Sequence, residues 1–113
     1  MTYTIPAHES GDTFEGITFT VEVNGVALDL LGATILATFI LQTNKRIIHT
    51  LNSGAGGGLT IVDSSPASGI FYLDKQIINW RSGVYDYEIK FTLADGTVKT
   101  YIVGTWEITN WHG

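Results

Sequence analysis

The alternation of apolar and polar residues between positions 83 and 93 constrains the fold of this chain more than any other feature. Every second position on one side of this segment is aromatic or aliphatic: Tyr85, Tyr87, Ile89, Phe91 and Leu93. The positions between them hold Asp86, Glu88, Lys90 and Thr92. A period of two residues places all the apolar side chains on one face of an extended strand. The segment is therefore predicted to be a β-strand with one buried face.

Other segments rich in Thr, Val, Ile and aromatic residues indicate further strands, because these residues suit a pleated, half-buried surface. The segment 17–23 alternates in the same way. Residues 34–43 are apolar on both faces, as expected of a central strand; a helix of about three turns is the competing interpretation, which the β-branched residues disfavour. The last strand is expected at 98–109, with a bulge at Gly104. Shorter strands are expected at 46–51, 59–62 and 69–74.

Turn-forming residues separate these predicted strands. Asn24 and Gly25 suit the positive φ angles of a tight turn, and Asp95 followed by Gly96 predicts a hairpin. The glycine-rich residues 52–58 are expected to form a loop that holds no fixed shape alone. Residues 76–80 are interpreted as one helical turn that crosses between two sheets.

These features give about seven strands and hardly any helix, without the strand–helix alternation that a parallel sheet requires. We predict an all-β fold, an immunoglobulin-like antiparallel β-sandwich formed by one domain over residues 1–113; a small closed barrel is the alternative. Such sandwiches commonly place a tyrosine near the start of the penultimate strand, with its hydroxyl bonded back to the backbone. Tyr85, which follows Gly83, occupies that position, although packing in the core would also explain it.

The composition excludes several classes of function. The chain has 6 Lys and Arg residues against 11 Asp and Glu residues, a formal charge of −5. An acidic protein is poorly suited to bind nucleic acid or an anionic membrane surface. The absence of cysteine excludes disulfides, thiolate nucleophiles and cysteine-based metal sites. No apolar run reaches the roughly 18 residues of a membrane span, and the N-terminus is unlike a secretory signal.

Residues that could support catalysis are few. Asp86 and Glu88 share a strand face about 7 Å apart, a spacing that a glycosidase could use, but outward carboxylates usually serve solubility. The glycine run 54–58 lacks the residues and the helix of a phosphate-binding loop. A small hydrolase would need these groups to gather in a pocket; we predict no enzyme, no cofactor and no metal. Three histidines in distant segments are interpreted as solvated: His8, His49 and His112.

Three tryptophans are candidates for an interface: Trp80, Trp106 and Trp111. Aromatic rings also stack on sugar rings, so a carbohydrate-binding module is the alternative function, although large aromatic residues in a small sandwich more often belong to the core or to an interface. Trp111 lies after the last predicted strand, where no segment is expected to cover it, which favours contact with a partner.

Seven short segments together resemble the immunoglobulin-like domain at the N-terminus of phage baseplate upper proteins, and kindred small tail proteins of phages and prophages. They follow the family in order and spacing, and are residues 11–14, 24–34, 58–63, 68–73, 82–87, 95–97 and 104–109. The resemblance implies a structural domain that docks a host-adhesion component onto the virion, usually in an oligomeric assembly. The sequence stops at Gly113 without the long extension of the baseplate proteins, which favours a connector or adaptor.

From this resemblance we expect a tail or baseplate protein of the virion, synthesised in the host bacterial cytoplasm. Its expected partners are other tail or baseplate proteins and further copies of itself. Within the shared segments, Asp29 is expected to cap backbone N–H groups in a turn between the sheets. Gly69 is expected to begin a strand where a side chain would collide with that corner. Gly11 and Asp12 are expected to turn the first strand, at a sheet edge, into the second.

Overall fold

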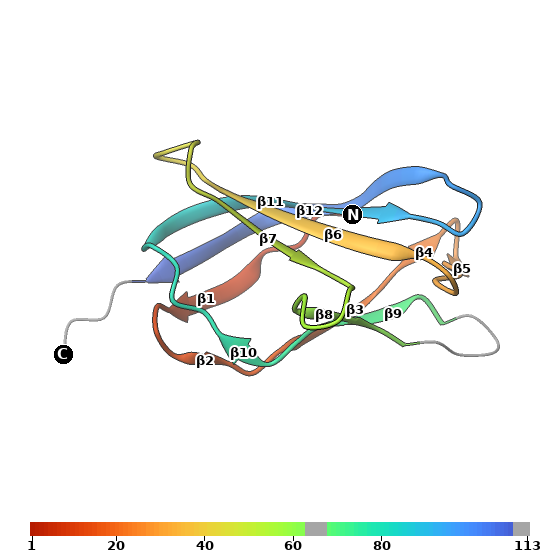
Figure 1. Ribbon diagram of the computed structural model, residues 1–113. Helices are drawn as coiled ribbons and strands as arrows, with labels where there is room; N and C mark the ends of the chain where they lie inside the picture. The colour runs from red at the N-terminus through yellow and green to blue at the C-terminus, as the bar shows by residue number, and fades with distance from the viewer. Residues whose placement is uncertain (63–67, 110–113) are drawn as a thin grey trace.

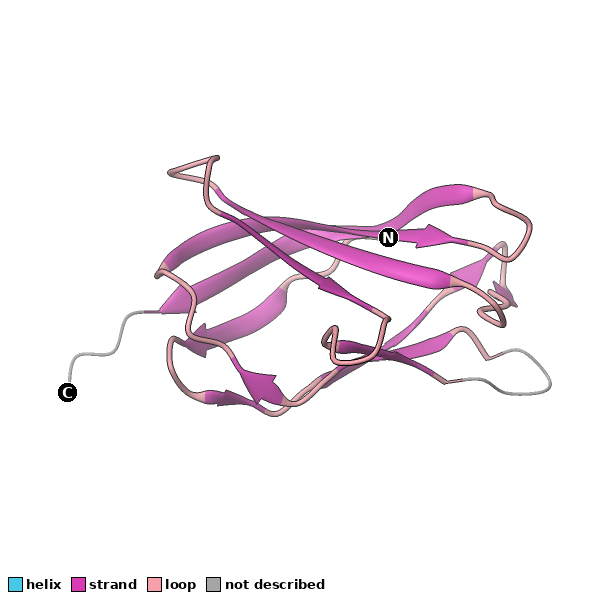
Figure 2. Cartoon of the chain, in the orientation of Figure 1, coloured by secondary structure: helices cyan, strands magenta, loops and turns pink. Residues whose placement is uncertain are grey.

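The structure, a computed structural model that describes residues 1–62 and 68–109, is built from strands in two facing layers (Figures 1 and 2). One layer is a five-stranded sheet in the order β1-β12-β11-β6-β7. Its strands are β1 (Ile5–Glu9), β12 (Val98–Thr109), β11 (Gly83–Thr92), β6 (Thr34–Leu41) and β7 (Ile48–Asn52). No helix occurs among these described residues.

The facing layer is a three-stranded sheet with two short strand pairs beside it. The sheet has the order β3 (Ile17–Thr20), β9 (Ile70–Leu73) and β8 (Leu59–Ile61). The short pairs are β2 (Thr13–Phe14) with β10 (Gln76–Ile77), and β4 (Glu22–Val23) with β5 (Val26–Ala27).

The strand order confirms the predicted β-sandwich of immunoglobulin type. In that fold one sheet contains the consecutive neighbours G, F and C, with C′ beside C in the variable type, and the other contains B, E and D. Here β12-β11-β6-β7 and β3-β9-β8 take these positions. One pair within the five-stranded sheet departs from the antiparallel arrangement, because β1 runs parallel to β12. These two strands come from opposite ends of the chain, so no hairpin forces them to be antiparallel.

The apolar face of β11 lies in the core, as its alternation predicted. Tyr85, Tyr87, Ile89 and Phe91 are at most 3% exposed. They pack beside the inward residues of β6, which also alternate: Ile35, Ala37, Phe39 and Leu41. No polar or charged residue of the described part of the chain is buried. Burial of a large apolar side chain is worth about 1.5–3 kcal/mol, so this double row accounts for much of the stability of the sheet.

Both predicted tight turns are present. Asn24 and Gly25 have φ angles of 53° and 78° between β4 and β5. Between β11 and β12, the Leu93 N–H donates to the Thr97 carbonyl at 2.8 Å, and Gly96 has a φ of 89°. The Thr97 N–H also donates to the Asp95 carboxylate at 2.9 Å. This hydrogen bond stabilises the charged carboxylate and lowers the pKa of Asp95.

Two predicted segments differ from the structure. Residues 17–23 do not form one strand: β3 pairs with β9, and β4 pairs with β5, because the chain changes partner at Val21. Residues 76–80 are not a helical turn. Gln76 and Ile77 are extended as β10 against β2, and the Ile78 carbonyl accepts the Gly11 N–H at 2.8 Å. Pairing with β2 provides hydrogen-bond partners for backbone groups that a helical turn would have bonded internally. The extended conformation also buries the next residue, Ile78, which is 1% exposed.

The bulge predicted at Gly104 lies elsewhere. The register between β11 and β12 shifts after the pair Ile89–Ile102 to the pair Lys90–Thr100, so Tyr101 is the extra residue. Gly104 sits in regular register and is needed for a close approach. A Cβ atom there would lie 1.8 Å from the carbonyl oxygen of Tyr3.

Hydrogen bonds with Asn52 hold the glycine-rich loop in place. The Gly54 N–H donates to the Asn52 side-chain oxygen at 2.8 Å, and the Gly57 N–H donates to the Gly54 carbonyl at 2.9 Å. The Asn52 N–H donates to the Gly57 carbonyl at 2.8 Å. The asparagine supplies the order that the glycines lack, since an Asn side chain can bond the backbone two residues on.

Candidate functional site

The residues predicted to shape the ends of the sandwich make the contacts expected of them. The Tyr85 hydroxyl donates to the Arg81 carbonyl at 2.7 Å, the corner hydrogen bond of immunoglobulin-like domains. Burial raises the pKa of Tyr85, and the charge of Arg81 opposes that shift. Gly83 precedes it with a φ of 143°, and a Cβ there would lie 2.6 Å from a methyl carbon of Leu41. These contacts are structural, because they join the chain to itself.

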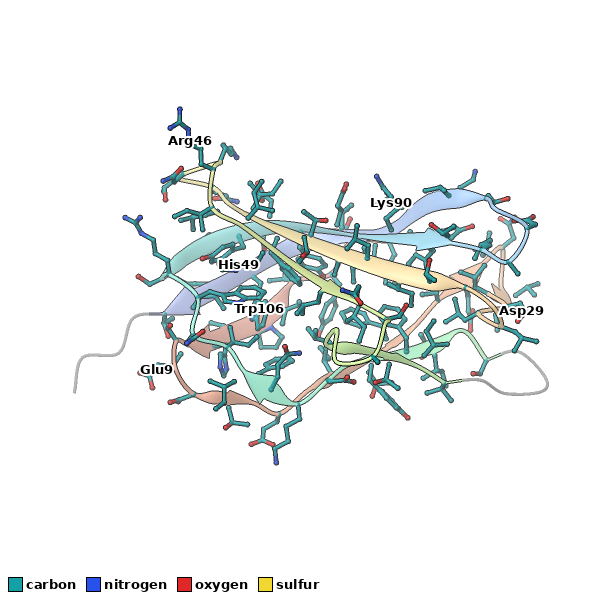
Figure 3. The ribbon with its side chains drawn as sticks, viewed as in Figure 1. Glu9, Asp29, Arg46, His49, Lys90 and Trp106 are labelled. Carbon is teal, nitrogen blue, oxygen red and sulfur yellow. The ribbon has the colours of Figure 1, made fainter. Side chains whose placement is uncertain are left out.

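The opposite end is built by Asp29 and Gly69. The Asp29 carboxylate accepts the Leu31 N–H at 3.0 Å, so it caps the turn that leads towards β6. Asp29 lies at the end of the molecule away from Trp106 (Figure 3). Gly69 has a φ of 67°, and a Cβ there would lie 2.3 Å from the Val21 carbonyl oxygen. The collision expected at this corner is therefore with backbone, which cannot easily move.

The tryptophans do not form a surface platform in the described residues. Trp106 is 0% exposed, and its indole N–H donates to the Pro6 carbonyl at 3.0 Å. The interpretation of Trp106 as an interface residue is wrong, because its position on β12 faces the core. Trp80 is half-buried, with its ring centroid 5.4 Å from that of Trp106. Trp111 lies outside the described residues, so sugar stacking could use only Trp80 among the described tryptophans.

His49 and His8 are half-buried beside this aromatic cluster, so they are less solvated than we predicted. The ring of His49 stacks on Trp80 with 4.4 Å between centroids and 2° between planes. Burial lowers the pKa of His49, because the charged imidazolium loses hydration. His8 lies with its Nε2 2.9 Å from the Asp12 carbonyl oxygen. His112 is outside the described residues. No three His, Asp or Glu side chains of residues 1–62 and 68–109 gather in a metal-binding arrangement.

Asp86 and Glu88 point outward and bind neighbouring polar groups. The Asp86 carboxylate accepts the Gln42 amide at 2.7 Å and lies 3.9 Å from the Lys45 ammonium. Glu88 lies 3.8 Å from the Lys90 ammonium, and Lys90 projects away from the facing layer (Figure 3). All these ion-pair side chains are well exposed. Such exposed pairs contribute about 0–1 kcal/mol to the stability of the fold.

A groove of about 490 Å³ opens beside the glycine loop, and it is lined by residues 30, 32–33, 53–57, 59–61 and 74. Asp74 is an acidic residue of its lining, and its two carboxylate oxygens accept the Thr60 hydroxyl at 2.8 and 2.9 Å. Among the residues that the structure describes, no histidine and no second carboxylate line it.

Sequence analysis missed the outer face of the five-stranded sheet. Four large aliphatic side chains on this face are 42–55% exposed; we call them the outer-face residues, and they are Leu36, Ile48, Val98 and Val103. The apolar second face of 34–43 was the available signal, but we interpreted it as burial on both sides. Only one face of β6 meets the second layer, so Leu36 is left exposed.

Comparison with models of protein families, with curated proteins and with solved structures finds no match for this chain. The described residues contain no helix that is long and apolar enough to cross a membrane. The structure is therefore a β-sandwich with three surface features. At one end, aromatic rings pack on one another. A polar groove lies beside the glycine loop, and apolar side chains are exposed on the outer face of the five-stranded sheet.

Proposed function

We propose that this protein is a structural component of a phage or prophage tail or baseplate, where it acts as a connector or adaptor. It would act through contacts with other tail proteins and with further copies of itself, and would perform no catalysis. The likeness to baseplate domains in the segments quoted above supports the setting, and the immunoglobulin-like order of the strands agrees with what that likeness implies.

The observation that carries the proposal is the set of outer-face residues. They lie among charged side chains on one sheet: Val103 is opposite Glu88, and Leu36 is opposite Lys90. An interface typically combines such apolar contact groups with a polar rim. The four side chains stand in different cross-strand rows, and the proposal takes them together as apolar contact points on one sheet face that a partner would cover.

The test is incorporation into particles. The tagged chain is expressed during induction of the phage or prophage that encodes it, and purified virions are probed for it. Val103→Lys should reduce incorporation, because it places a charge among the outer-face residues. Thr18→Lys is the matched control, since Thr18 is exposed on the other sheet. A chain that is absent from virions, or equal incorporation of both variants and the wild type, would contradict the proposal.

A further inference from the structure

The edge of the five-stranded sheet at β7 differs from the other edges of the two main sheets. Natural proteins protect edge strands with proline, bulges or short length, because open backbone groups pair with other strands. The opposite edge, β1, contains Pro6 and an irregular register between Ile5 and His8. The edges of the smaller sheet, β3 and β8, have four and three residues. β7 has five residues in regular register and no proline.

The hydrogen bonds beside β7 show which of its backbone groups are open. The Leu41 N–H donates to the Ile47 carbonyl and the Ser53 N–H donates to the Ile35 carbonyl, both at 3.0 Å. Odd-numbered residues of β7 therefore face β6, and Ile48 and Thr50 direct their backbone groups away from the sheet. Within residues 1–62 and 68–109, no hydrogen bond to those backbone groups is present.

The N–H groups of the even-numbered residues on either side already have hydrogen-bond acceptors. The Asn52 N–H donates to the Gly57 carbonyl at 2.8 Å, and the Arg46 N–H donates to the Asn44 side-chain oxygen at 3.1 Å. The open part of the edge thus consists of the backbone N–H and C=O groups of Ile48 and Thr50, with His49 between them. Only one two-fold register uses all four open groups. It pairs Ile48 with Thr50 of a second copy and places the two His49 residues opposite each other.

We propose that two copies of this chain pair antiparallel through β7, about a two-fold axis at His49, to form one continuous ten-stranded sheet. This inference rests on the proposed function, because it names one contact of the proposed assembly. The strand carries no charged side chain other than an ionisable His49, so an identical strand brings no fixed like charge to the edge. The two facing Ile48–Thr50 pairs are β-branched on both sides, which suits cross-strand packing on the outer face.

Single cysteines test the register, since the chain has no native cysteine. In this pairing the two residues at position 49 form a non-hydrogen-bonded pair with Cβ atoms about 4.5–5.5 Å apart, close to disulfide geometry. His49→Cys should therefore form a disulfide-linked dimer under mild oxidation. Thr18→Cys, which is exposed on β3 of the other sheet, should remain unlinked as the control. Equal linkage of both variants, or linkage of neither, would overturn the proposed register.

Sedimentation equilibrium tests the edge itself. Wild type should form a dimer, and Thr50→Pro should weaken dimerisation by roughly 10- to 100-fold, because it removes two of four interchain hydrogen bonds. The Thr50 N–H faces away from β6, so this proline should leave the monomer folded; circular dichroism verifies this. Ile48→Lys should also weaken the dimer, whereas Thr18→Lys, on the other sheet, should not.

The two proposals fail in different ways. A dimer that Thr50→Pro and Ile48→Lys leave intact would overturn pairing through β7 while the assembly role stands. A wild-type chain that stays monomeric, or a His49→Cys chain that links only to a different polypeptide, would overturn self-pairing. Virion incorporation is measured separately and decides the proposed function in each case.

Discussion

Gly104→Ala should detach the N-terminal residues from the sheet. A Cβ at position 104 would lie 1.8 Å from the Tyr3 carbonyl oxygen, and this atom belongs to backbone. That carbonyl also accepts the hydroxyl of Tyr87, whose pKa is raised by burial. The added methyl group and the Tyr3 carbonyl cannot occupy the same space, so residues 1–3 must move.

The magnitude follows from the hydrogen bonds that this movement breaks. Three main-chain bonds hold the segment: the terminal ammonium to the Tyr101 carbonyl, the Val103 N–H to the Met1 carbonyl, and the Tyr3 N–H to the Val103 carbonyl, at 2.9, 3.0 and 2.9 Å. Each contributes about 0.5–1.5 kcal/mol net, and the Tyr87 hydroxyl loses its partner at a cost of about 1–3 kcal/mol. Glycine-to-alanine replacement restricts the unfolded chain and returns about 0.4–1 kcal/mol. The expected loss in the free energy of unfolding is therefore about 1.5–7 kcal/mol.

A double-mutant cycle measured by urea denaturation separates this mechanism from general disruption. Tyr87→Phe should cost about 1–2 kcal/mol in the wild type but should cost nothing, or restore stability, with Gly104→Ala, because it then removes a hydroxyl that has already lost its partner. The Val103 amide should lose hydrogen-exchange protection in Gly104→Ala. Val103→Ala is the control, since its side chain points outward. Additive effects of Gly104→Ala and Tyr87→Phe, or a loss below about 0.5 kcal/mol for Gly104→Ala, would refute the reasoning.

Three further outcomes follow from the core and the aromatic end. Trp106→Ala should lower the free energy of unfolding by about 3–5 kcal/mol in chemical denaturation, because it empties a fully buried site; a loss below about 1 kcal/mol would contradict the packing. Tyr85→Phe should cost about 0.5–1.5 kcal/mol, since it deletes the bond to the Arg81 carbonyl; an unchanged denaturation midpoint would contradict this role. Because burial lowers the pKa of His49 below its unfolded value of about 6.5, the unfolded chain binds the proton more tightly. The contribution of His49 to stability should be complete above a pH of about 6.5 and should be lost as the pH falls through the lowered pKa of the folded chain. In thermal melts, the His49→Gln variant should therefore lose part of the acid dependence of stability. Identical pH profiles for this variant and the wild type would refute this role of His49.

Most strands and turns were predictable because their signals are local. The period-two pattern of Tyr85 to Phe91 follows from backbone geometry alone, and so do the positive φ angles at Gly25 and Gly96. The segment Gln76–Ile77 was misassigned because two residues are too few to show a period. Its conformation depends on β2, more than sixty residues earlier.

The candidate surfaces were less predictable, because exposure depends on what covers a strand. The apolar pattern of β6 is compatible with burial on one face or on both, and only the arrangement of the layers leaves Leu36 exposed. The edge position of β7 likewise depends on strand order, which no residue within β7 encodes. The composition of β7 indicated that it would pair with another strand, but it did not indicate whether β7 would have one neighbouring strand or two.

Within this protein, the sequence by itself determined the faces of the long strands and the places where the chain turns, since both depend on interactions over a few residues. The tertiary structure alone decided that Trp106 is buried beneath Pro6 and that Gly104 lies against Tyr3, contacts that span about one hundred residues of sequence. It also decided which strand ends a sheet. These properties depend on packing between segments that are distant in the sequence, so no local residue pattern can predict them.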